Sequence, residues 1–249
     1  RKLKMEVFSS PFDETAVDFL EKLNVNAYKV ASPEITNIPL IEKIAKTGKP
    51  IIISSGLSNF NDIDDAIKII RSFNINEICV LKCTTSYPAP PEEANLLTIP
   101  DISSQFNVLS GLSDHTLGYS APIASVVLGA SIIEKHIKLD NSNSTPDSFF
   151  SLNELDFKKM VDEIKFTEKA LGKISYDITK SAQPSLKNRS SIYCSNKISK
   201  GEIFTRKNLK VVRPGLGLHP KFFKKIIGKI SKHNLEKGDA LSWDNIDDE

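Results

Sequence analysis

Short runs of mostly apolar, β-branched residues alternate with longer stretches of helical periodicity in the first part of the chain. The short runs, which predict strands, are 5–10, 27–32, 50–56, 77–84, 107–115 and 131–137. Their continuous apolar character is typical of parallel strands that are buried on both faces. The stretches between them, and residues 153–171, carry apolar residues at the spacing of an amphipathic helix. This even alternation favours a TIM (β/α)₈ barrel over an open sheet, because no glycine-rich dinucleotide fingerprint follows any strand.

The composition and the periodicity of the sequence change after Gly172. Residues 173–189 are polar with little periodicity, and we predict a linker there. The segments 197–209 (KISKGEIFTRKNL) and 234–246 (NLEKGDALSWDNI) then repeat one pattern, in which a Lys-Gly step suits a tight turn. We therefore predict a partial barrel at 1–172 and, at 190–249, a small β-rich domain with pseudo-twofold symmetry.

Composition and charge narrow the class of function. The chain has 249 residues, a net charge of +2 and no run of Lys or Arg with interleaved aromatics, which argues against a nucleic-acid partner. No apolar run reaches the ~20 residues of a membrane span, and we expect neither a membrane segment nor a signal peptide. The three scattered cysteines, Cys79, Cys83 and Cys194, fit reduced thiols in the cytoplasm.

Polar side chains gather at the C-terminal ends of the predicted strands, where barrels of this kind build their active sites. Lys29 supplies a point charge, and Ser10, Ser32 and Ser54 supply directed hydroxyl donors. This combination suits an anionic phosphate group. Any one of these serines is as readily explained by capping a strand or a turn, but that explanation weakens for a set on one rim.

Two of the four histidines, His115 and His136, close adjacent predicted strands. Neighbouring parallel strands lie roughly 5 Å apart, so the two imidazoles are candidates for a shared divalent metal, with core histidines as the alternative. Asp114 and Glu134 are close enough in sequence to orient the rings. Because two protein ligands make a weak site, an exchangeable Mn²⁺ or Mg²⁺ is favoured over structural zinc.

Arg213 stands in a rigid setting, since a Pro-Gly step follows it in the segment 211–220 (VVRPGLGLHP). It is either an arginine that reaches an anionic ligand or a surface residue of a turn.

These residues and their surroundings resemble the bacterial sialic-acid synthase family, the phosphoenolpyruvate-condensing nonulosonate synthases. The similar motifs follow the family's order through nearly the whole chain: SSPF, YKVASPE, PIIISSG, LKCTTSYPAPPEEANL, GLSDHT, IIEKHIKLD, PDSFFSL and VRPGLGLHPKF. The last two motifs are more similar to the branch that makes pseudaminic acid than to the neuraminate and legionaminate branches.

The resemblance implies a TIM barrel followed by an antifreeze-like (SAF, β-clip) domain, which reaches over the partner's active site in a domain-swapped homodimer. It also implies a reaction. Phosphoenolpyruvate condenses with an N-acylated amino sugar, here 2,4-diacetamido-2,4,6-trideoxy-L-altrose, to give a nine-carbon keto sugar acid and phosphate. The implied roles are phosphoenolpyruvate binding by Ser10, Lys29, Ser32 and Ser54, metal binding by His115 and His136, sugar positioning or polarisation by Glu34, Tyr87, Glu134 and Asp147, and sugar contact across the dimer by Arg213.

Two departures from the family pattern affect these expectations. The family's first two βα units, which carry a catalytic Glu and a substrate-binding Lys, have no counterpart in the sequence. We therefore expect a barrel without those units and a chain that is inactive by itself. In addition, Thr85 and Ser86 stand where many relatives have an Asn, which is expected to change a contact to the substrate.

Two other functions stay open. A Schiff-base aldolase would use Lys29 or Lys135 as its amine, although it would leave the histidine pair unexplained. A non-catalytic sugar-binding or assembly module on residues 190–249 would leave His136 without a role.

Overall fold

The computed structural model describes residues 2–139 and 145–247 of the chain. They belong to two compact units, Arg1–Lys173 and Ile174–Glu249. Among the described residues, no helix combines the length and the apolar character needed to cross a membrane.

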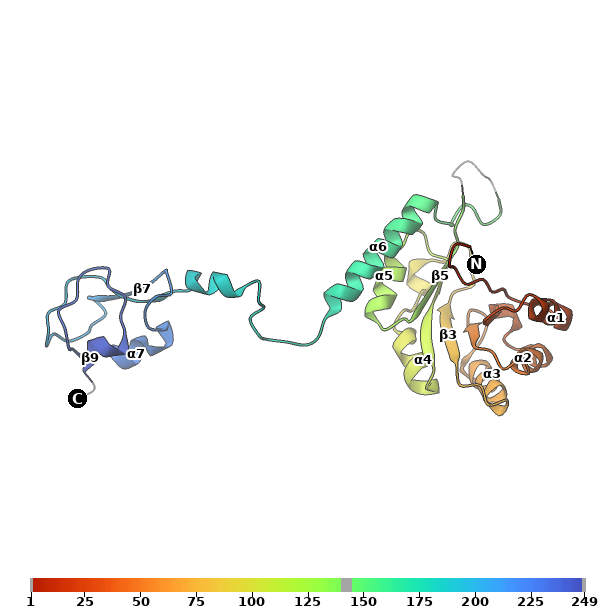
Figure 1. Ribbon diagram of the computed structural model, residues 1–249, viewed down its shortest axis with the longest axis horizontal. Coiled ribbons are helices and arrows are strands. Elements are labelled where there is room, and N and C mark those ends of the chain that lie inside the picture. Colours follow the sequence, from red (N-terminus) through yellow and green to blue (C-terminus); the bar gives the residue numbers. More distant parts are fainter. Residues whose placement is uncertain (1, 140–144, 248–249) are drawn as a thin grey trace. The chain divides into compact units, whose positions relative to one another are not determined.

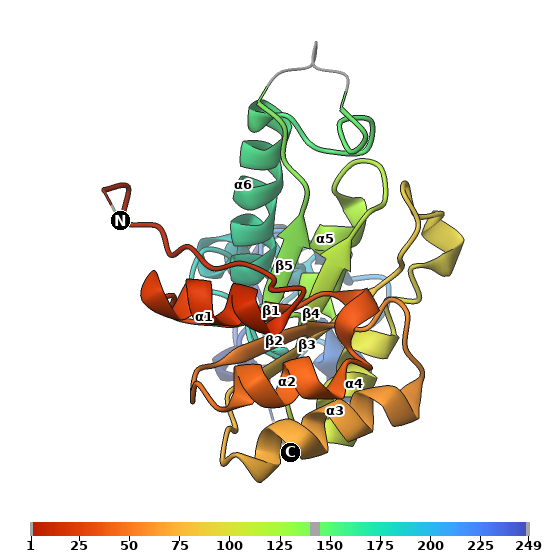
Figure 2. The same ribbon diagram turned by 90° about the vertical axis from the view of Figure 1, so that its right-hand side faces the viewer.

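The first unit is built on a parallel sheet of five strands that pair in sequence order (Figure 1). The strands are β1 (Tyr28–Val30), β2 (Ile51–Ser54), β3 (Ile78–Cys83), β4 (Leu109–Asp114) and β5 (Ile132–Lys135). Because all five run in one direction, their carboxyl ends meet at one edge of the sheet. Figure 2 shows how the sheet curls between its helices. Five of the six predicted strands are therefore present, in the predicted order.

Helices connect the strands at the predicted places. They are α1 (Glu14–Lys22), α2 (Ile38–Ala45), α3 (Phe60–Ser72), α4 (Thr98–Phe106), α5 (Ser120–Val127) and α6 (Glu154–Leu171), with short 3₁₀ turns at Ser32–Glu34 and Pro91–Glu93. Two of them begin at clear capping residues. The side chain of Asn59 accepts a hydrogen bond from the amide of Asp62, and Asn153 does the same for Asp156.

Alternation along the strands divides their side chains between two faces. One face packs against the helices and supplies much of the main core, including Tyr28, Val30, Ile53 and Val80. The residues between them point to the opposite face of the sheet. That face is apolar near the amino ends of the strands and polar near their carboxyl ends, so chemistry is confined to one edge.

The predicted strand at 5–10 is not formed. This segment runs without regular secondary structure, and its one backbone hydrogen bond to β1 joins the amide of Lys29 to the carbonyl of Ser9 at 3.4 Å. Met5 and Val7 are 64% and 72% exposed, so neither side chain is held by a core. An apolar run becomes a strand only when a ladder and a packed face stabilise it, and this segment has neither.

Gly111 allows β4 and β5 to approach closely. A Cβ atom at this position would collide with the backbone carbonyl of Ile132 and lie 2.6 Å from Leu81 Cδ2. We expect Gly111→Ala to lower the free energy of unfolding by about 1–3 kcal/mol, the usual cost of overpacking. The adjacent buried change Ser110→Ala is the control. Equal urea midpoints for the two variants would contradict the prediction.

The second unit is small and rich in short strands: β6 (Ser191–Cys194), β7 (Leu209–Val212), β8 (Ile230–Ser231) and β9 (Ile246–Asp247). Its helical turns include α7 (Phe223–Ile226) and the 3₁₀ turns Pro220–Phe222 and Trp243–Asn245. The two copies of its internal repeat pair with each other. Ile198 and Leu235, which occupy the same position in the two copies, exchange both backbone hydrogen bonds at 2.8–2.9 Å. Thr205 and Ser242, again equivalent, each donate a backbone hydrogen bond to an asparagine side chain three residues later.

Residues 173–189, which were predicted to be a linker with little periodicity, contain a 3₁₀ helix at Gln183–Asn188, just before β6. Its residues are exposed, so the polar composition was a correct guide to exposure and a poor guide to conformation. The turn is tied to a later loop as well, because the amide of Gly215 donates to the carbonyl of Lys187 at 2.9 Å.

Candidate active site

A cavity of about 140 Å³ lies at the carboxyl ends of the parallel strands. All five strands contribute to it, through their last residues or through the segments that follow. Cys83 and Ser113 are among its lining residues. The structure brings together seven of the site candidates named from the sequence: Lys29, Ser32, Ser54, Tyr87, His115, Glu134 and His136.

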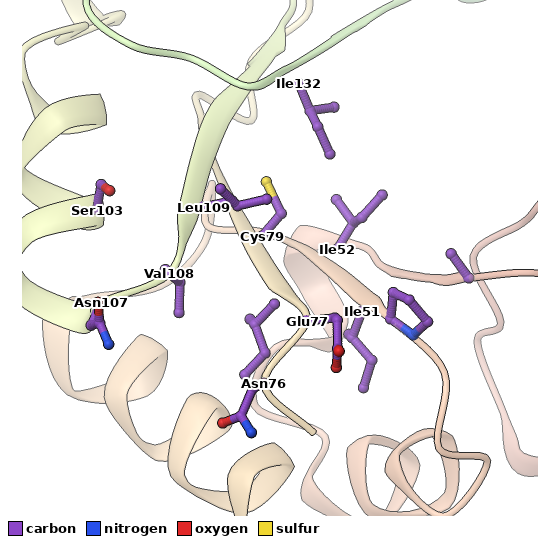
Figure 3. Close-up of a pocket in the computed structure, with 13 residues that line it drawn as sticks. Ile51, Ile52, Asn76, Glu77, Cys79, Ser103, Asn107, Val108, Leu109 and Ile132 are labelled. Atoms are coloured by element: carbon purple, nitrogen blue, oxygen red, sulfur yellow. The ribbon is translucent and has the colours of Figure 1, made fainter. Parts of the chain in front are cut away.

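A larger cavity of about 610 Å³ opens near the amino ends of the strands (Figure 3). The side chains of Ile52, Cys79, Leu109 and Ile132 line it, and Glu77 is the one charged residue in its lining. It offers neither a cation nor an imidazole. Size alone would favour this cavity as the active site, but the chemistry of the lining side chains favours the smaller cavity.

The two histidine rings lie side by side at the smaller cavity, with their centroids 5.2 Å apart. His115 Nδ1 is 3.0 Å from the carbonyl oxygen of Thr84, and His136 Nδ1 is 3.5 Å from Asp147 Oδ2. If Nδ1 carries the proton in each ring, His115 donates to the Thr84 carbonyl, and His136 Nδ1 faces Asp147 at a longer, ion-pair distance. In both rings Nε2 is then the atom left for a metal. This is the arrangement by which proteins orient metal-binding imidazoles.

The orienting groups differ from those expected from the sequence. Asp114 was expected to orient His115, and Glu134 was expected to orient His136. Asp114 instead contacts Lys135 on the other face of the sheet, because adjacent strand residues point to opposite sides. Glu134 is on the correct face, but it bonds to Ser113 and Lys29.

The residues fit a divalent metal with two protein ligands. Within residues 2–139 and 145–247, no group of three or more His, Cys, Asp and Glu side chains is arranged to hold a metal ion. A metal at His115 and His136 would therefore take most of its ligands from water or substrate, as an open and exchangeable site does.

Ionisation at the histidines follows from burial and from their neighbours. Burial, together with the adjacent His115, lowers the pKa of His136, which favours the neutral form that binds metals. Burial by itself would lower the pKa of His115, but the Cys83 thiol and the Thr84 carbonyl raise it overall. Cys83 Sγ is 3.9 Å from His115 Nδ1, and this contact offsets the effect of burial and lowers the pKa of the thiol.

Lys29 and Glu134 form a charged pair inside the cavity. The distance from Lys29 Nζ to Glu134 Oε2 is 3.2 Å, and Ser113 Oγ donates to Glu134 Oε1 at 2.6 Å. Nearby, Ser54 is 2% exposed, and its hydroxyl has no hydrogen-bond partner among the residues that the structure describes. Buried hydroxyl groups are normally paired, so a ligand that accepts a hydrogen bond is expected beside Ser54.

Two aromatic rings stand over the histidines. Tyr87 lies 4.4 Å from His115, and Phe150 lies 4.9 Å from His136, between ring centroids. Phe150 was not among the residues predicted from the sequence, although the Phe pair after Asp147 was a signal that could have found it. Tyr87 remains 52% exposed and can meet a ligand at the mouth of the cavity.

Four candidates of the first unit do not line the cavity. Asp147 contacts His136, which does line it. Ser10 belongs to the extended segment beside β1, and Glu34 ends the 3₁₀ turn Ser32–Glu34, where it accepts a hydrogen bond from Asn37 at 3.0 Å. Thr85 packs against Gly56 and lies 3.9 Å from Cys83 Sγ.

Arg213 belongs to the second unit, where it lines a separate cavity with Arg189 and His219. The loop that carries it is anchored by the carbonyl of Pro214, which accepts hydrogen bonds from Ser191 Oγ and Tyr193 Oη at 2.8 and 2.9 Å. This anchoring agrees with the rigid setting predicted for Arg213.

Lys135 is excluded as the amine of an aldolase. Its side chain is fully buried, and its ammonium group is paired with Asp114. A Schiff base needs a free amine that a carbonyl substrate can reach.

Known proteins match the chain along its whole length. A sequence model of the NeuB family matches residues 1–176, and a model of the SAF domain matches residues 189–247. The pseudaminic acid synthase of Helicobacter pylori is 45% identical over 248 residues, which cover 99% of this chain and 73% of the relative. The N,N'-diacetyllegionaminic acid synthase of Campylobacter jejuni is 36% identical, with 97% and 73% covered.

A solved structure is also similar to this chain. The spore coat polysaccharide biosynthesis protein SpsE of Bacillus subtilis matches with a TM-score of 0.67 and 33% sequence identity. The match covers 100% of this chain and 75% of that one.

Proposed function

Because the chain belongs to the NeuB family, we propose that it carries the catalytic cavity of a pseudaminic acid synthase. The proposed reaction joins phosphoenolpyruvate to 2,4-diacetamido-2,4,6-trideoxy-L-altrose and releases phosphate. The observation that carries the proposal is the unpartnered Ser54 hydroxyl beside Lys29, in one cavity with two histidines. The higher identity to a pseudaminic acid synthase than to a legionaminic acid synthase favours this sugar.

The anion is assigned to the inner part of the cavity. Lys29 supplies the positive charge, and Ser54 supplies a hydroxyl donor that no group in residues 2–139 and 145–247 uses. Ser32 Oγ accepts from the amide of Gly56 at 3.0 Å. Its hydroxyl, which also interacts with the Cys83 thiol, would supply a further donor to a phosphate or carboxylate oxygen. Ser10 would add a further donor to the same ligand.

The sugar is assigned to the outer part, because about 140 Å³ is small beside the ~300–1,000 Å³ of ordinary ligand pockets. Tyr87 and Glu134 would meet its hydroxyl and amide groups, and Glu34, Thr85 and Asp147 would complete that side. A divalent metal, Mn²⁺ or Mg²⁺, held by His115 and His136 would polarise the open-chain aldehyde.

The chemistry then depends on positioning. Carbon 3 of phosphoenolpyruvate forms a bond to the aldehyde carbon, and the aldehyde oxygen becomes a hydroxyl group. Water adds to carbon 2, and the bond between carbon 2 and the bridging oxygen breaks, so that phosphate leaves with that oxygen. Lys29 would stabilise the departing anion.

We further propose that the five strands, together with residues 5–10 as a sixth strand once the preceding units pair with them, belong to an eight-stranded barrel. The curated relatives extend beyond the matched region, which covers 73% of their length in two cases, and two βα units would fit in the remainder. Residues 1–249 would then lack part of the substrate site and be inactive alone. Normal turnover by residues 1–249 would contradict this.

The proposed assembly is a domain-swapped homodimer in the cytoplasm, in which Arg213 contacts the sugar bound to the partner subunit. Its support is the rigid loop around Arg213, whose side chain has no acidic partner among the described ion pairs. A monomer at equilibrium in the analytical ultracentrifuge, at assay concentrations, would contradict it.

Phosphate release from bridging-¹⁸O phosphoenolpyruvate tests the proposed function. The protein, including the N-terminal segment that the relatives carry, is assayed with the altrose derivative, its legionaminate counterpart and N-acetylmannosamine. We expect Mn²⁺-dependent turnover that is fastest with the altrose derivative, and ³¹P NMR should place the ¹⁸O in phosphate. Faster turnover with another sugar would move the protein from the pseudaminic acid branch of the family to the branch that uses that sugar. Borohydride trapping of a lysine adduct would favour an aldolase.

A further inference from the structure

A buried ion pair lies directly behind the two histidines. Lys135 Nζ is 2.6 Å from Asp114 Oδ2, and the two side chains are 0% and 2% exposed. The same ammonium group also donates to the backbone carbonyl of Thr116. None of the roles assigned above uses this pair.

The pair is built across the two strands that carry the histidines. Asp114 and Lys135 are opposite each other in the register of β4 and β5, and each immediately precedes a histidine. Since neighbouring residues of a strand face opposite sides, the pair points away from the cavity that His115 and His136 line. It therefore holds the strand ends together from the back.

Thr116 extends this network around His115. Its amide and its hydroxyl group donate to Asp114 at 3.0 and 3.2 Å, while its carbonyl accepts from Lys135. His115 is thus bracketed by two residues that are both tied to Lys135. A shift of this network would move the backbone of His115 relative to that of His136.

Stabilisation of the fold is a weak explanation for a buried ion pair at this position. Burying two charges costs several kcal/mol, and apolar residues of similar size often serve a fold as well. Groups behind metal ligands, in contrast, hold the ligand geometry, and their loss commonly weakens metal binding about 10–100-fold. The position of the pair, one residue before each histidine, agrees with the second role.

We propose that Lys135 is a positioning residue, which acts through Asp114 and Thr116 to fix the spacing of the His115 and His136 rings. The ligand it serves is a divalent cation. This inference rests on the metal role given to the histidines in the proposed function.

Mn²⁺ binding measured by electron paramagnetic resonance tests the proposal without requiring turnover. The double variant Asp114→Asn/Lys135→Met removes both charges together, so that neither is left buried and unpaired. We expect a folded protein whose Kd for Mn²⁺ rises about 10–100-fold. The control is Asp18→Asn/Lys43→Met, which removes a partly exposed pair of the same 2.6 Å length and should leave the Kd unchanged.

An unchanged Kd in a folded Asp114→Asn/Lys135→Met variant would overturn the proposal, even if the melting temperature fell. If that variant does not fold, Thr116→Val tests the proposal in its place, because it removes one donor to Asp114 and keeps the shape of the side chain. A Kd raised several-fold supports the network, and an unchanged Kd refutes it. If the unmodified protein and His136→Ala bind Mn²⁺ equally, the metal role itself fails, which is a separate result.

Discussion

His136→Ala is expected to abolish Mn²⁺-dependent phosphate release in the complete protein. The histidine pair supplies the protein ligands of the proposed metal, and one imidazole cannot hold an exchangeable cation where two make only a weak site. The side chain of His136 is 34% exposed, so its removal should leave no closed cavity and little loss of stability. We expect at least a ~10³-fold fall in kcat and loss of Mn²⁺ binding, with the circular dichroism spectrum unchanged.

A histidine outside the cavity provides the control. His233 is exposed in the second unit, and His233→Ala should retain full activity and full Mn²⁺ affinity. His115→Ala should repeat the loss seen with His136→Ala. Undiminished activity of a folded His136→Ala protein would end the metal assignment.

Lys29→Met is expected to remove most of the affinity for phosphoenolpyruvate and most of the turnover. Methionine keeps the length of the side chain and loses the charge, so the effect reports on the cation. Lys29 is 7% exposed and paired with Glu134, and loss of a buried cation that stabilises a leaving anion typically costs ~10²–10³-fold in rate. Steady-state kinetics should show kcat/KM for phosphoenolpyruvate reduced by at least that factor.

The exposed Lys46, which follows α2, gives a matched control as Lys46→Met and should behave like the unmodified protein. A Lys29→Met protein that changes the KM for the sugar alone would move Lys29 to the other substrate. The ion pair with Glu134 makes that outcome informative, since Glu134 is assigned to the sugar.

Much of the first unit could be predicted from the pattern of residues. The helix predicted at 153–171 is observed at Glu154–Leu171, because a long amphipathic period and a capping Asn determine it locally. The same holds for the strand ends that carry His115 and His136, since parallel strands in sequence order place their carboxyl ends together. The match to a synthase family rested on the motifs at those ends.

Other features depended on neighbours that no local pattern specifies. Residues 5–10 have the composition of a strand, yet they lack a ladder to stabilise them. Asp114 is adjacent to His115 in sequence and faces the other side of the sheet, whereas Asp147 is distant in sequence and contacts His136. Sequence distance predicted the wrong orienting group for both histidines, since His115 contacts the Thr84 carbonyl and His136 contacts Asp147.

The sequence by itself determined which residue types stand at the ends of the strands, and hence that a cation, hydroxyl groups and two imidazoles would share one edge. Only the tertiary structure decided which partner each of these groups has. It paired Glu134 with Lys29, left Ser54 without a partner in the described part of the chain, and set Lys135 behind the histidines with Asp114. The physical reason is that periodicity along a strand assigns a side chain to a face, while its contacts depend on the register between strands and on the segments folded over them.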